Sequence, residues 1–217
     1  MATNNNAIWT GSYGYYNEGM LVGEWVSLPM DSDALQATIR TACKVDAHHE
    51  EVGIFDTDFD FDGYQVSQYD SIDSVNALAA AIESADEHQL NAATAYMSML
   101  CDLDALKAAN IIMNADDIAY YAYTVDSPLM SDDERLGYSL LEDTDTMRKL
   151  EDMGIVGYFD FEGYGRDARL SGDVDAFEDG YMVYSEVDDD TYTASEILEM
   201  CGYSATDNDA TDESAAA

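Results

Sequence analysis

Hydrophobic and polar residues alternate at the start of the chain, a pattern typical of β-strands. It predicts strands over residues 7–11 and 20–28, joined by a loop rich in Gly, Tyr and Asn. We expect these strands to supply apolar residues to a core: Trp9, Leu21, Val22, Trp25 and Val26. Within the loop, Tyr13, Tyr15 and Tyr16 are expected to anchor it by packing.

The next elements complete a small mixed domain. Leu35, Ile39 and Cys43 recur at helical spacing after Pro29, which predicts a helix that begins near Asp31 or Ser32. Short strands are expected at residues 51–55 and 64–68, on either side of an acidic segment. Together these elements predict an N-terminal α+β domain over residues 1–70.

From residue 71 the apolar spacing changes to the period of a helix. Val75, Leu78 and Ile82 predict one helix, Leu90 and Met97 fall in a second, and a shorter third helix begins near residue 103. We expect a central small helical domain over residues 71–112.

The remaining pattern predicts a second mixed domain over residues 113–187. Residues 116–125 fit either a strand or a helix, and Ser131 with Glu134 forms a capping box that opens a helix. Further helices are expected at residues 145–153, ended by Gly154, and at 158–170, with a closing strand at 180–187. Residues 188–217 are polar and acidic, and we expect a largely disordered tail there, with a transient helix at residues 194–200. The fold class is α+β with short antiparallel sheets.

The charge of the chain narrows its possible functions. The 217 residues include 46 Asp and Glu against 8 Lys and Arg, a net charge of −38. Nucleic acid and anionic membranes are therefore poor partners, because their phosphates require a basic surface. The chain still has 47% hydrophobic residues and 16 Tyr, which indicates packed cores. The sequence shows neither a membrane-spanning apolar stretch nor a secretion signal at Met1 to Asn6, so we expect a cytoplasmic protein.

The motifs of catalysis and metal binding are weak. Residues 58–63 (DFDFDG) begin like an EF-hand loop, but Tyr69 stands where the closing Glu must be. His48 and His49 are neighbours and do not share one helix face, so a surface loop is the simpler interpretation. Cys43, Cys101 and Cys201 lack the spacing of a zinc site and are expected to be buried free thiols. We expect no catalytic residues, no metal and no cofactor.

The acidic segment at residues 56–62 has a second interpretation. In an extended chain, Asp56, Asp58, Asp60 and Asp62 share one face and form a ladder of carboxylates. Phe55, Phe59 and Phe61 then point the other way and can anchor the segment in a core. A solvated acidic loop is the alternative.

Two separated signatures resemble the ArdA antirestriction proteins. Residues 8–19 (IWTGSYGYYNEG) and 21–25 (LVGEW) fit the family pattern YNxGxLxGxW, and residues 158–167 (YFDFEGYGRD) with 170–172 (LSG) fit YxDYxxYGRDLxLSG. The signature positions are Tyr16, Asn17, Gly19, Gly23, Trp25, Tyr158, Asp160, Tyr164, Gly165, Arg166 and Asp167. The resemblance covers about residues 7–187 and leaves out the tail.

A looser match occupies the place of the family's antirestriction motif, an acidic helix. Its residues are Asp132, Asp133, Glu134, Leu136, Tyr138, Leu140, Leu141 and Glu142. The resemblance implies that this motif lies near a dimer contact.

The resemblance also implies a function. ArdA proteins are elongated homodimers of three small domains per subunit, and their carboxylates imitate the phosphates of bent duplex DNA. They occupy the DNA-binding groove of the specificity and methyltransferase subunits of type I restriction-modification enzymes, in the bacterial cytoplasm, and protect mobile-element DNA without catalysis. The carboxylates that we expect on such a surface are Asp56, Asp58, Asp60, Asp62, Asp70, Asp73, Glu83, Asp86, Glu87, Asp102, Asp104, Asp116 and Asp117.

Two other classes of function fit the composition alone. A halophilic enzyme or cation-binding protein would use its acids for solvation or for a metal. An acidic interaction module would neutralise other basic DNA-binding proteins without imitating a duplex.

Overall fold

The computed structural model describes residues 6–125, 127, 129–183 and 185–205, which form two compact units. The first unit contains residues 1–115 and 188–217, and the second contains Asp116–Val187. The chain therefore leaves the first unit, forms the second and returns. At the crossing, the side chain of Asn114 donates hydrogen bonds to the Asp188 carbonyl at 3.0 Å and to Thr191 Oγ1 at 3.3 Å.

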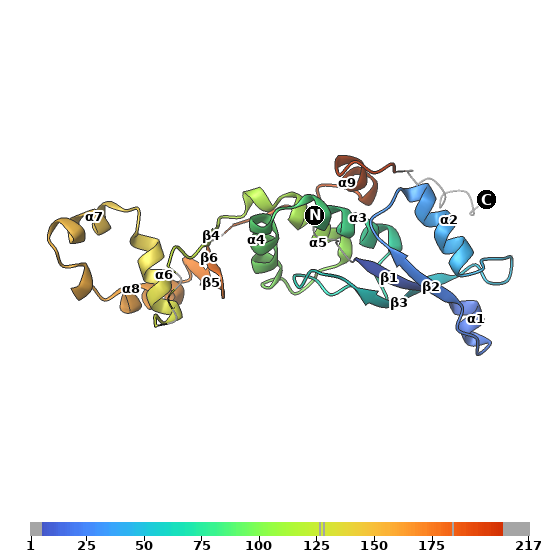
Figure 1. The fold of residues 1–217 in the computed structure, drawn as a ribbon, viewed down its shortest axis with the longest axis horizontal. Coiled ribbons are helices and arrows are strands. Elements are labelled where there is room, and N and C mark those ends of the chain that lie inside the picture. The colour runs from blue at the N-terminus through green and yellow to red at the C-terminus, as the bar shows by residue number, and fades with distance from the viewer. Residues whose placement is uncertain (1–5, 126, 128, 184, 206–217) are drawn as a thin grey trace, which may run out of the picture. The chain divides into compact units, whose positions relative to one another are not determined.

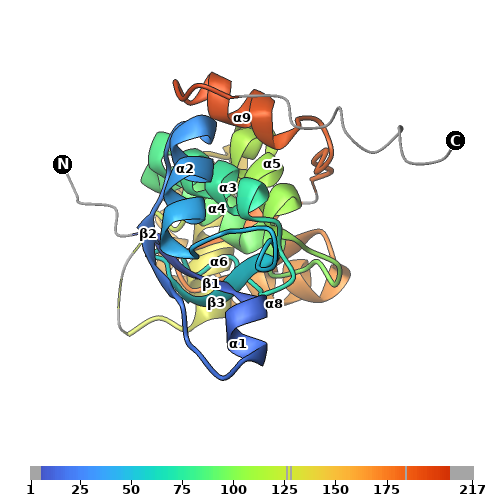
Figure 2. The same cartoon turned by 90° about the vertical axis from the view of Figure 1, so that its right-hand side faces the viewer.

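A three-stranded antiparallel sheet begins the first unit (Figure 1). Its strands are β1 (Ala7–Ser12), β2 (Gly23–Ser27) and β3 (Val52–Asp58), in the order β2-β1-β3. Helix α2 (Ser32–Ala42) packs on the face that carries Ile8, Thr10 and Val26, all of them buried. Figures 1 and 2 both place α2 on one side of the sheet. The loop after β1 begins with a short helix, α1 (Tyr13–Asn17), where the sequence predicted only a loop.

Helices make up the rest of the first unit. These are α3 (Ile72–Ser84), α4 (Glu87–Met97), α5 (Ala105–Met113) and α9 (Ala194–Met200). The predicted helices from residue 71 are confirmed. The side-chain amide of buried Asn76 in α3 pairs with the backbone of Met30, donating at 2.8 Å and accepting at 3.0 Å. Residues on both sides of the predicted boundary at residue 70 thus belong to one unit, and the three-domain division stays a prediction.

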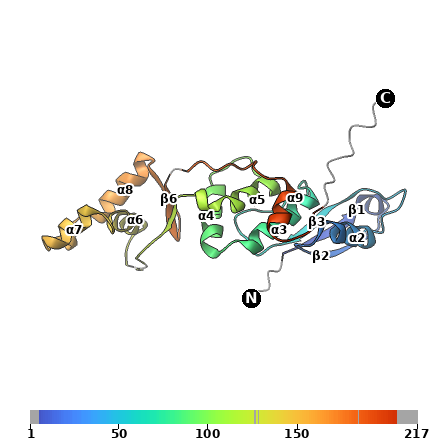
Figure 3. The ribbon, with the colours of Figure 1, turned by 90° about the horizontal axis from the view of Figure 1, so that it is seen from above.

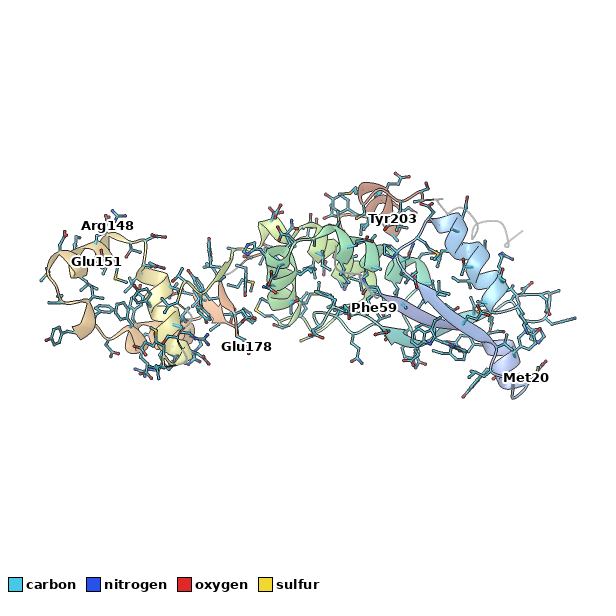
Figure 4. The ribbon with its side chains drawn as sticks, in the orientation of Figure 1. Met20, Phe59, Arg148, Glu151, Glu178 and Tyr203 are labelled. Atoms are coloured by element: carbon cyan, nitrogen blue, oxygen red, sulfur yellow. The ribbon has the colours of Figure 1, made fainter. Side chains whose placement is uncertain are left out.

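The expected disordered tail is wrong for residues 188–205. Helix α9 packs against α3 and α5 through Ile197 and Leu198, which are buried (Figure 3). Ahead of it, the buried side chain of Asn110 clamps Tyr192, donating to its carbonyl at 2.9 Å and accepting from its N–H at 2.7 Å. After it, the Tyr203 hydroxyl donates to Glu83 at 2.8 Å (Figure 4). The acidic composition of the segment concealed these few specific contacts, and residues 206–217 lie outside the described residues.

The second unit is built on another three-stranded antiparallel sheet. Its strands are β4 (Tyr120–Ala122), β5 (Val174–Ala176) and β6 (Gly180–Val183), in the order β4-β6-β5. Its helices are α6 (Asp132–Leu141), α7 (Asp145–Asp152) and α8 (Phe161–Ser171), with 3₁₀ turns η1 (Ala115–Asp117) and η2 (Val156–Tyr158). Gly154 follows α7 with φ 69°, as the predicted glycine stop requires.

The two sheets and the helices confirm the α+β fold class. Other predictions fail at short segments. No strand forms at residues 64–68, where a turn is held by side-chain hydrogen bonds, and β5 was not predicted. The ambiguous residues 116–125 contain strand β4. Cys43 is a buried free thiol as expected, whereas Cys101 is exposed.

None of the described helices is both long enough and apolar enough to cross a bilayer.

Candidate functional site

Acidic residues stand at the N-terminus of each helix from α2 to α9, either at the N-cap or in the first turn. Carboxylates at this position interact favourably with the helix dipole, each contributing about 0.3–1 kcal/mol. Asp86 and Asp104 also accept capping hydrogen bonds, from the backbone N–H groups of Gln89 and Lys107, both at 2.9 Å. These interactions offset part of the repulsion among so many like charges.

Both units are acidic, and the first is the more so. It has 27 acidic residues against three basic ones, while the second has 19 against five. Between Lys44 and Lys107 the chain has 14 acidic residues and no Lys or Arg. Four bases neutralise neighbouring acids in ion pairs: Lys107 with Asp102, Arg135 with Asp132, Arg148 with Asp145 and Arg169 with Asp133.

Most of the carboxylates expected on the acidic surface are exposed. Eleven of the thirteen are in the exposed class, and Asp70 and Asp73 are half-buried. Of these thirteen carboxylates, six accept no hydrogen bond from the part of the chain that the structure describes: Asp58, Asp60, Asp62, Asp73, Glu87 and Asp117. These groups are available to an external partner.

Asp70 does not belong to that surface. Its carboxylate accepts from the Tyr64 hydroxyl at 2.8 Å, from the Ser67 N–H at 2.7 Å and from the Ala105 N–H at 3.0 Å. It therefore ties Tyr64 and Ser67 to the first residue of α5. Burial of the ring, together with its hydrogen bond to Asp70, raises the pKa of the Tyr64 hydroxyl. Asp70 is a structural carboxylate, and its inclusion in the expected surface is wrong.

The ladder of Asp56, Asp58, Asp60 and Asp62 forms only in part. Strand β3 ends at Asp58, so the last two residues lie in the following turn and not in one extended strand. All four side chains are nevertheless exposed, and Phe61 between them is buried. A bulge in the pairing of β3 with β1 skips Phe55 and puts its ring on the same sheet face as Asp56, so the expected alternation is wrong at Phe55.

In the second unit the antirestriction motif and the C-terminal signature pack face to face. Helix α6 carries the motif and α8 the signature, and they meet at Gly137 and Gly165. A Cβ atom at Gly137 would collide with the Phe161 carbonyl, and one at Gly165 with the Asp133 carbonyl. The two backbones therefore touch directly, which only glycine permits.

An ion pair joins the same two helices. The Arg169 guanidinium donates two hydrogen bonds to the Asp133 carboxylate, at 2.9 and 3.1 Å. This pair lowers the pKa of Asp133, and the charge of Arg166 acts in the same direction. The paired residues line an open cavity of about 740 Å³, together with Asp132, Arg135, Glu178 and neighbouring groups.

The apolar residues of the motif are used within the unit. Leu136 packs with Val174 and Tyr181, and Leu141 packs with Met147 and Phe161. Leu140 and Tyr138 are partly buried against these two clusters. Leu136 and Leu141 are therefore unavailable for the implied dimer contact, while Asp132 is exposed, and Glu134 and Glu142 are half-buried.

The other signature residues have local tasks or lie on the surface. Asp160 caps α8 by accepting from the Gly163 N–H at 2.9 Å. Tyr164 contacts Phe159 with 6.2 Å between ring centroids. Tyr158, Arg166, Asp167, Tyr16 and Asn17 are exposed. Gly19 has φ 81°, in the left-handed region.

Two residues predicted for the core lie on the surface instead. Trp25 is 50% exposed and Leu21 70% exposed, while Val26 is buried as predicted. Trp25 pairs with Trp9 across β1 and β2, on the sheet face opposite α2. A strand whose other face is covered shows one residue in two to solvent, and the sequence does not indicate that these apolar positions are the outward ones.

His49 links the loop after β1 to the turn before β3. Its ring stacks on Tyr15 with 3.8 Å between centroids, Nδ1 lies 2.9 Å from Asp46, and Nε2 lies 3.4 Å from Glu18. The hydrogen bond to Asp46 raises the pKa of His49, and Glu18 adds to the effect. Within the described chain, no three His, Cys, Asp or Glu side chains gather as a metal-binding group.

This geometry predicts a pH-dependent contribution to stability. A His whose pKa is raised by folding stabilises the protein fully below its unfolded pKa of about 6.5, and the contribution is lost as the pH rises through the folded value. We expect the urea midpoint of the wild-type protein to decrease when the pH is raised from about 6 to about 8, and to decrease more than the midpoint of His49→Gln does. His49 and both Trp residues belong to the first unit, so Trp fluorescence measures the unfolding of that unit. Equal pH dependence in the two proteins would contradict the prediction.

The exposed carboxylates and the scarcity of bases define a strongly acidic protein. Residues 8–183 match the antirestriction protein (ArdA) family, and the chain belongs to this family. The resemblance of the two signatures is thereby confirmed, and helix α9 lies outside the matched residues. A comparison with curated proteins finds no match.

Proposed function

We propose that this antirestriction protein inhibits type I restriction-modification enzymes by presenting carboxylates in place of DNA phosphates. The target is the basic groove formed by the specificity and methyltransferase subunits. The observation that carries the proposal is the exposure of eleven of the thirteen expected carboxylates. All thirteen lie between Lys44 and residue 118. This segment contains a single Lys or Arg, Lys107, which is paired with Asp102.

The mechanism is competition for a surface built to hold DNA. Protein–DNA affinity comes largely from backbone charge, and sequence is read separately at base edges. An acidic protein that satisfies only the charge requirement can therefore inhibit enzymes of different sequence specificity. Long-range attraction between the acidic chain and the basic groove accelerates encounter.

The proposal includes the setting that the family resemblance implies. The protein acts as a homodimer in the bacterial cytoplasm, protects mobile-element DNA, and needs neither cofactor nor catalysis. Because Leu136 and Leu141 are buried in their own unit, exposed residues of α6 such as Asp132 are the better candidates for a contact near the motif.

The test is displacement of a labelled duplex from a purified type I enzyme. We expect the protein to displace the duplex competitively, and its inhibition constant to rise steeply with salt because bound ions are released on association. Polyglutamate of equal total charge is the matched control and should be much weaker, since it lacks a fixed arrangement. Absence of displacement would overturn the proposal. Equal potency of polyglutamate would favour a non-specific acidic interaction module.

A further inference from the structure

The face of the β1–β3 sheet opposite α2 carries a layer of aromatic rings. We call it the outer sheet face and define it by Trp9, Trp25, Phe55, Asp56 and Asp58, together with the glycine row beneath the rings. Cross-strand pairing places Trp9 beside both Trp25 and Asp56, and Ala7 beside Asp58. These residues alternate with Ile8 and Thr10, which face α2 and are buried.

A row of glycines lets these rings lie against the backbone. Gly11 pairs with Gly23 on one side and with Gly53 on the other. A Cβ atom at Gly11 would come within 2.6 Å of the Trp9 ring and 3.1 Å of the Phe55 ring. One at Gly53 would meet the Tyr13 ring at 2.5 Å. The result is a layer of tilted and edge-on aromatic rings that lies directly on the backbone of the sheet.

The layer continues into exposed apolar side chains. Trp25 is 50%, Tyr16 59% and Leu21 70% exposed, and the Tyr16 ring meets the edge of Phe55 with 5.6 Å between centroids. Met20 is also exposed, on the loop between α1 and β2 (Figure 4). Several exposed apolar side chains in one region of a unit are typical of an interaction surface.

Charge indicates what kind of partner fits. None of the three strands contains Lys or Arg, and Asp56 and Asp58 of β3 lie on the same face as the rings. A second copy of this chain would bring the same carboxylates and would be repelled. A basic partner would be attracted, and an aromatic face next to a carboxylate suits a guanidinium group in particular. The ring binds its plane by cation–π stacking, and the carboxylate accepts its N–H groups.

We propose that the outer sheet face binds arginine side chains of the restriction enzyme's DNA-binding surface, one stacked on Trp25 in place of a base face and another hydrogen-bonded to Asp56 in place of a phosphate, on the other side of Trp9. The inference rests on the proposed function and adds a contact that charge imitation alone does not supply. It assigns part of the binding affinity to a cation–π contact with a neutral ring, which adds no charge to the protein and therefore no salt-dependent ion release.

The test compares Trp25→Ala with the wild-type protein in the duplex-displacement assay at several salt concentrations. We expect Trp25→Ala to raise the inhibition constant about 10-fold while the slope of its logarithm against log salt stays unchanged. Trp25→Phe should keep most of the wild-type affinity. Asp56→Asn should reduce the slope of the logarithm of the inhibition constant against log salt. Tyr69→Ala removes an aromatic side chain that is 88% exposed and lies outside the strands, and it is the matched control. Far-UV circular dichroism and the urea midpoint establish that each variant is folded.

A second measurement separates arginine from charge. We expect the wild-type protein to bind oligoarginine more tightly than oligolysine, and Trp25→Ala to lose that preference. If the wild-type protein displaces duplex and Trp25→Ala does so equally well, this inference is wrong and the proposed function stands. If the wild-type protein displaces no duplex, both fail. A change in sedimentation on Trp25→Ala would assign the face to self-association and overturn the inference.

Discussion

Replacing Gly165 with alanine should strongly destabilise the second unit. The new Cβ would collide with the Asp133 carbonyl and lie 2.6 Å from the Gly137 N–H nitrogen. Both partners are backbone of α6, which the buried Leu136 holds in place. Overpacking costs typically 1–3 kcal/mol even among side chains, and we expect about 3 kcal/mol here because only backbone can move. Urea unfolding followed by far-UV circular dichroism measures the loss.

Gly157 provides the matched control for this substitution. It lies in the same unit, its φ is not in the left-handed region, and a Cβ there would meet nothing within 4 Å. Gly157→Ala should therefore leave the urea midpoint nearly unchanged. If Gly165→Ala were as stable as Gly157→Ala, the direct contact between α6 and α8 would be wrong. Inhibition by Gly165→Ala should decrease in proportion as the unfolded fraction of the second unit increases.

Neutralising four exposed carboxylates together should greatly weaken inhibition. The set Asp58→Asn, Asp60→Asn, Asp62→Asn and Glu87→Gln removes charges that have no hydrogen-bonded role within the described structure. Exposed ion pairs contribute about 0.2–1 kcal/mol each, so the four together are expected to cost about 1–4 kcal/mol of binding. Each single change should alter inhibition by no more than about 5-fold. The inhibition constant for duplex displacement, measured for the four singles and the quadruple variant, tests this.

The charge-retaining variant at the same positions is the control. Asp58→Glu, Asp60→Glu, Asp62→Glu and Glu87→Asp change side-chain length and keep all four charges, so inhibition should be largely preserved. The neutralised variant should unfold at higher urea than the wild type, because self-repulsion is reduced. Loss of inhibition with increased stability cannot be explained by unfolding. One surface Asp whose replacement alone abolished inhibition would contradict distributed binding.

Periodicity predicted most of the helices because each has a regular apolar face. Val75, Leu78 and Ile82 recur at helical spacing, and all three are buried in α3. The N-cap at Ser131 was also predicted from the sequence, and the Ser131 hydroxyl accepts a hydrogen bond from the Glu134 N–H at 3.2 Å. Such local signals depend on residues within one turn of each other, which is why a single sequence reveals them.

Contacts between distant residues were not predictable in this way. The bond of Asn110 to Tyr192 spans 82 residues, and Asp70 caps α5 from 35 residues away. Nothing in the sequence distinguishes the Asn110 amide or the Asp70 carboxylate from neighbouring polar side chains that face solvent. The expected tail and the expected acidic surface were therefore wrong at these positions.

The candidate site likewise has features that the sequence predicted and features that it did not. Exposure of the acidic residues followed from composition, since few positions in a small fold can bury a carboxylate. The outward direction of Trp25 did not, because a tryptophan in an apolar strand is expected in a core. It depends on which sheet face α2 covers.

The crossing at Asn114 has a practical consequence for dissecting the protein. The chain enters and leaves the second unit at two points joined by the 3.0 Å hydrogen bond from Asn114 to Asp188. A linker of a few residues could therefore close this gap and excise residues 116–187 without stretching the helices on either side. The shortened polypeptide would keep α9, both tryptophans and 27 of the 46 acidic residues, and so isolate the affinity of one unit for the restriction enzyme.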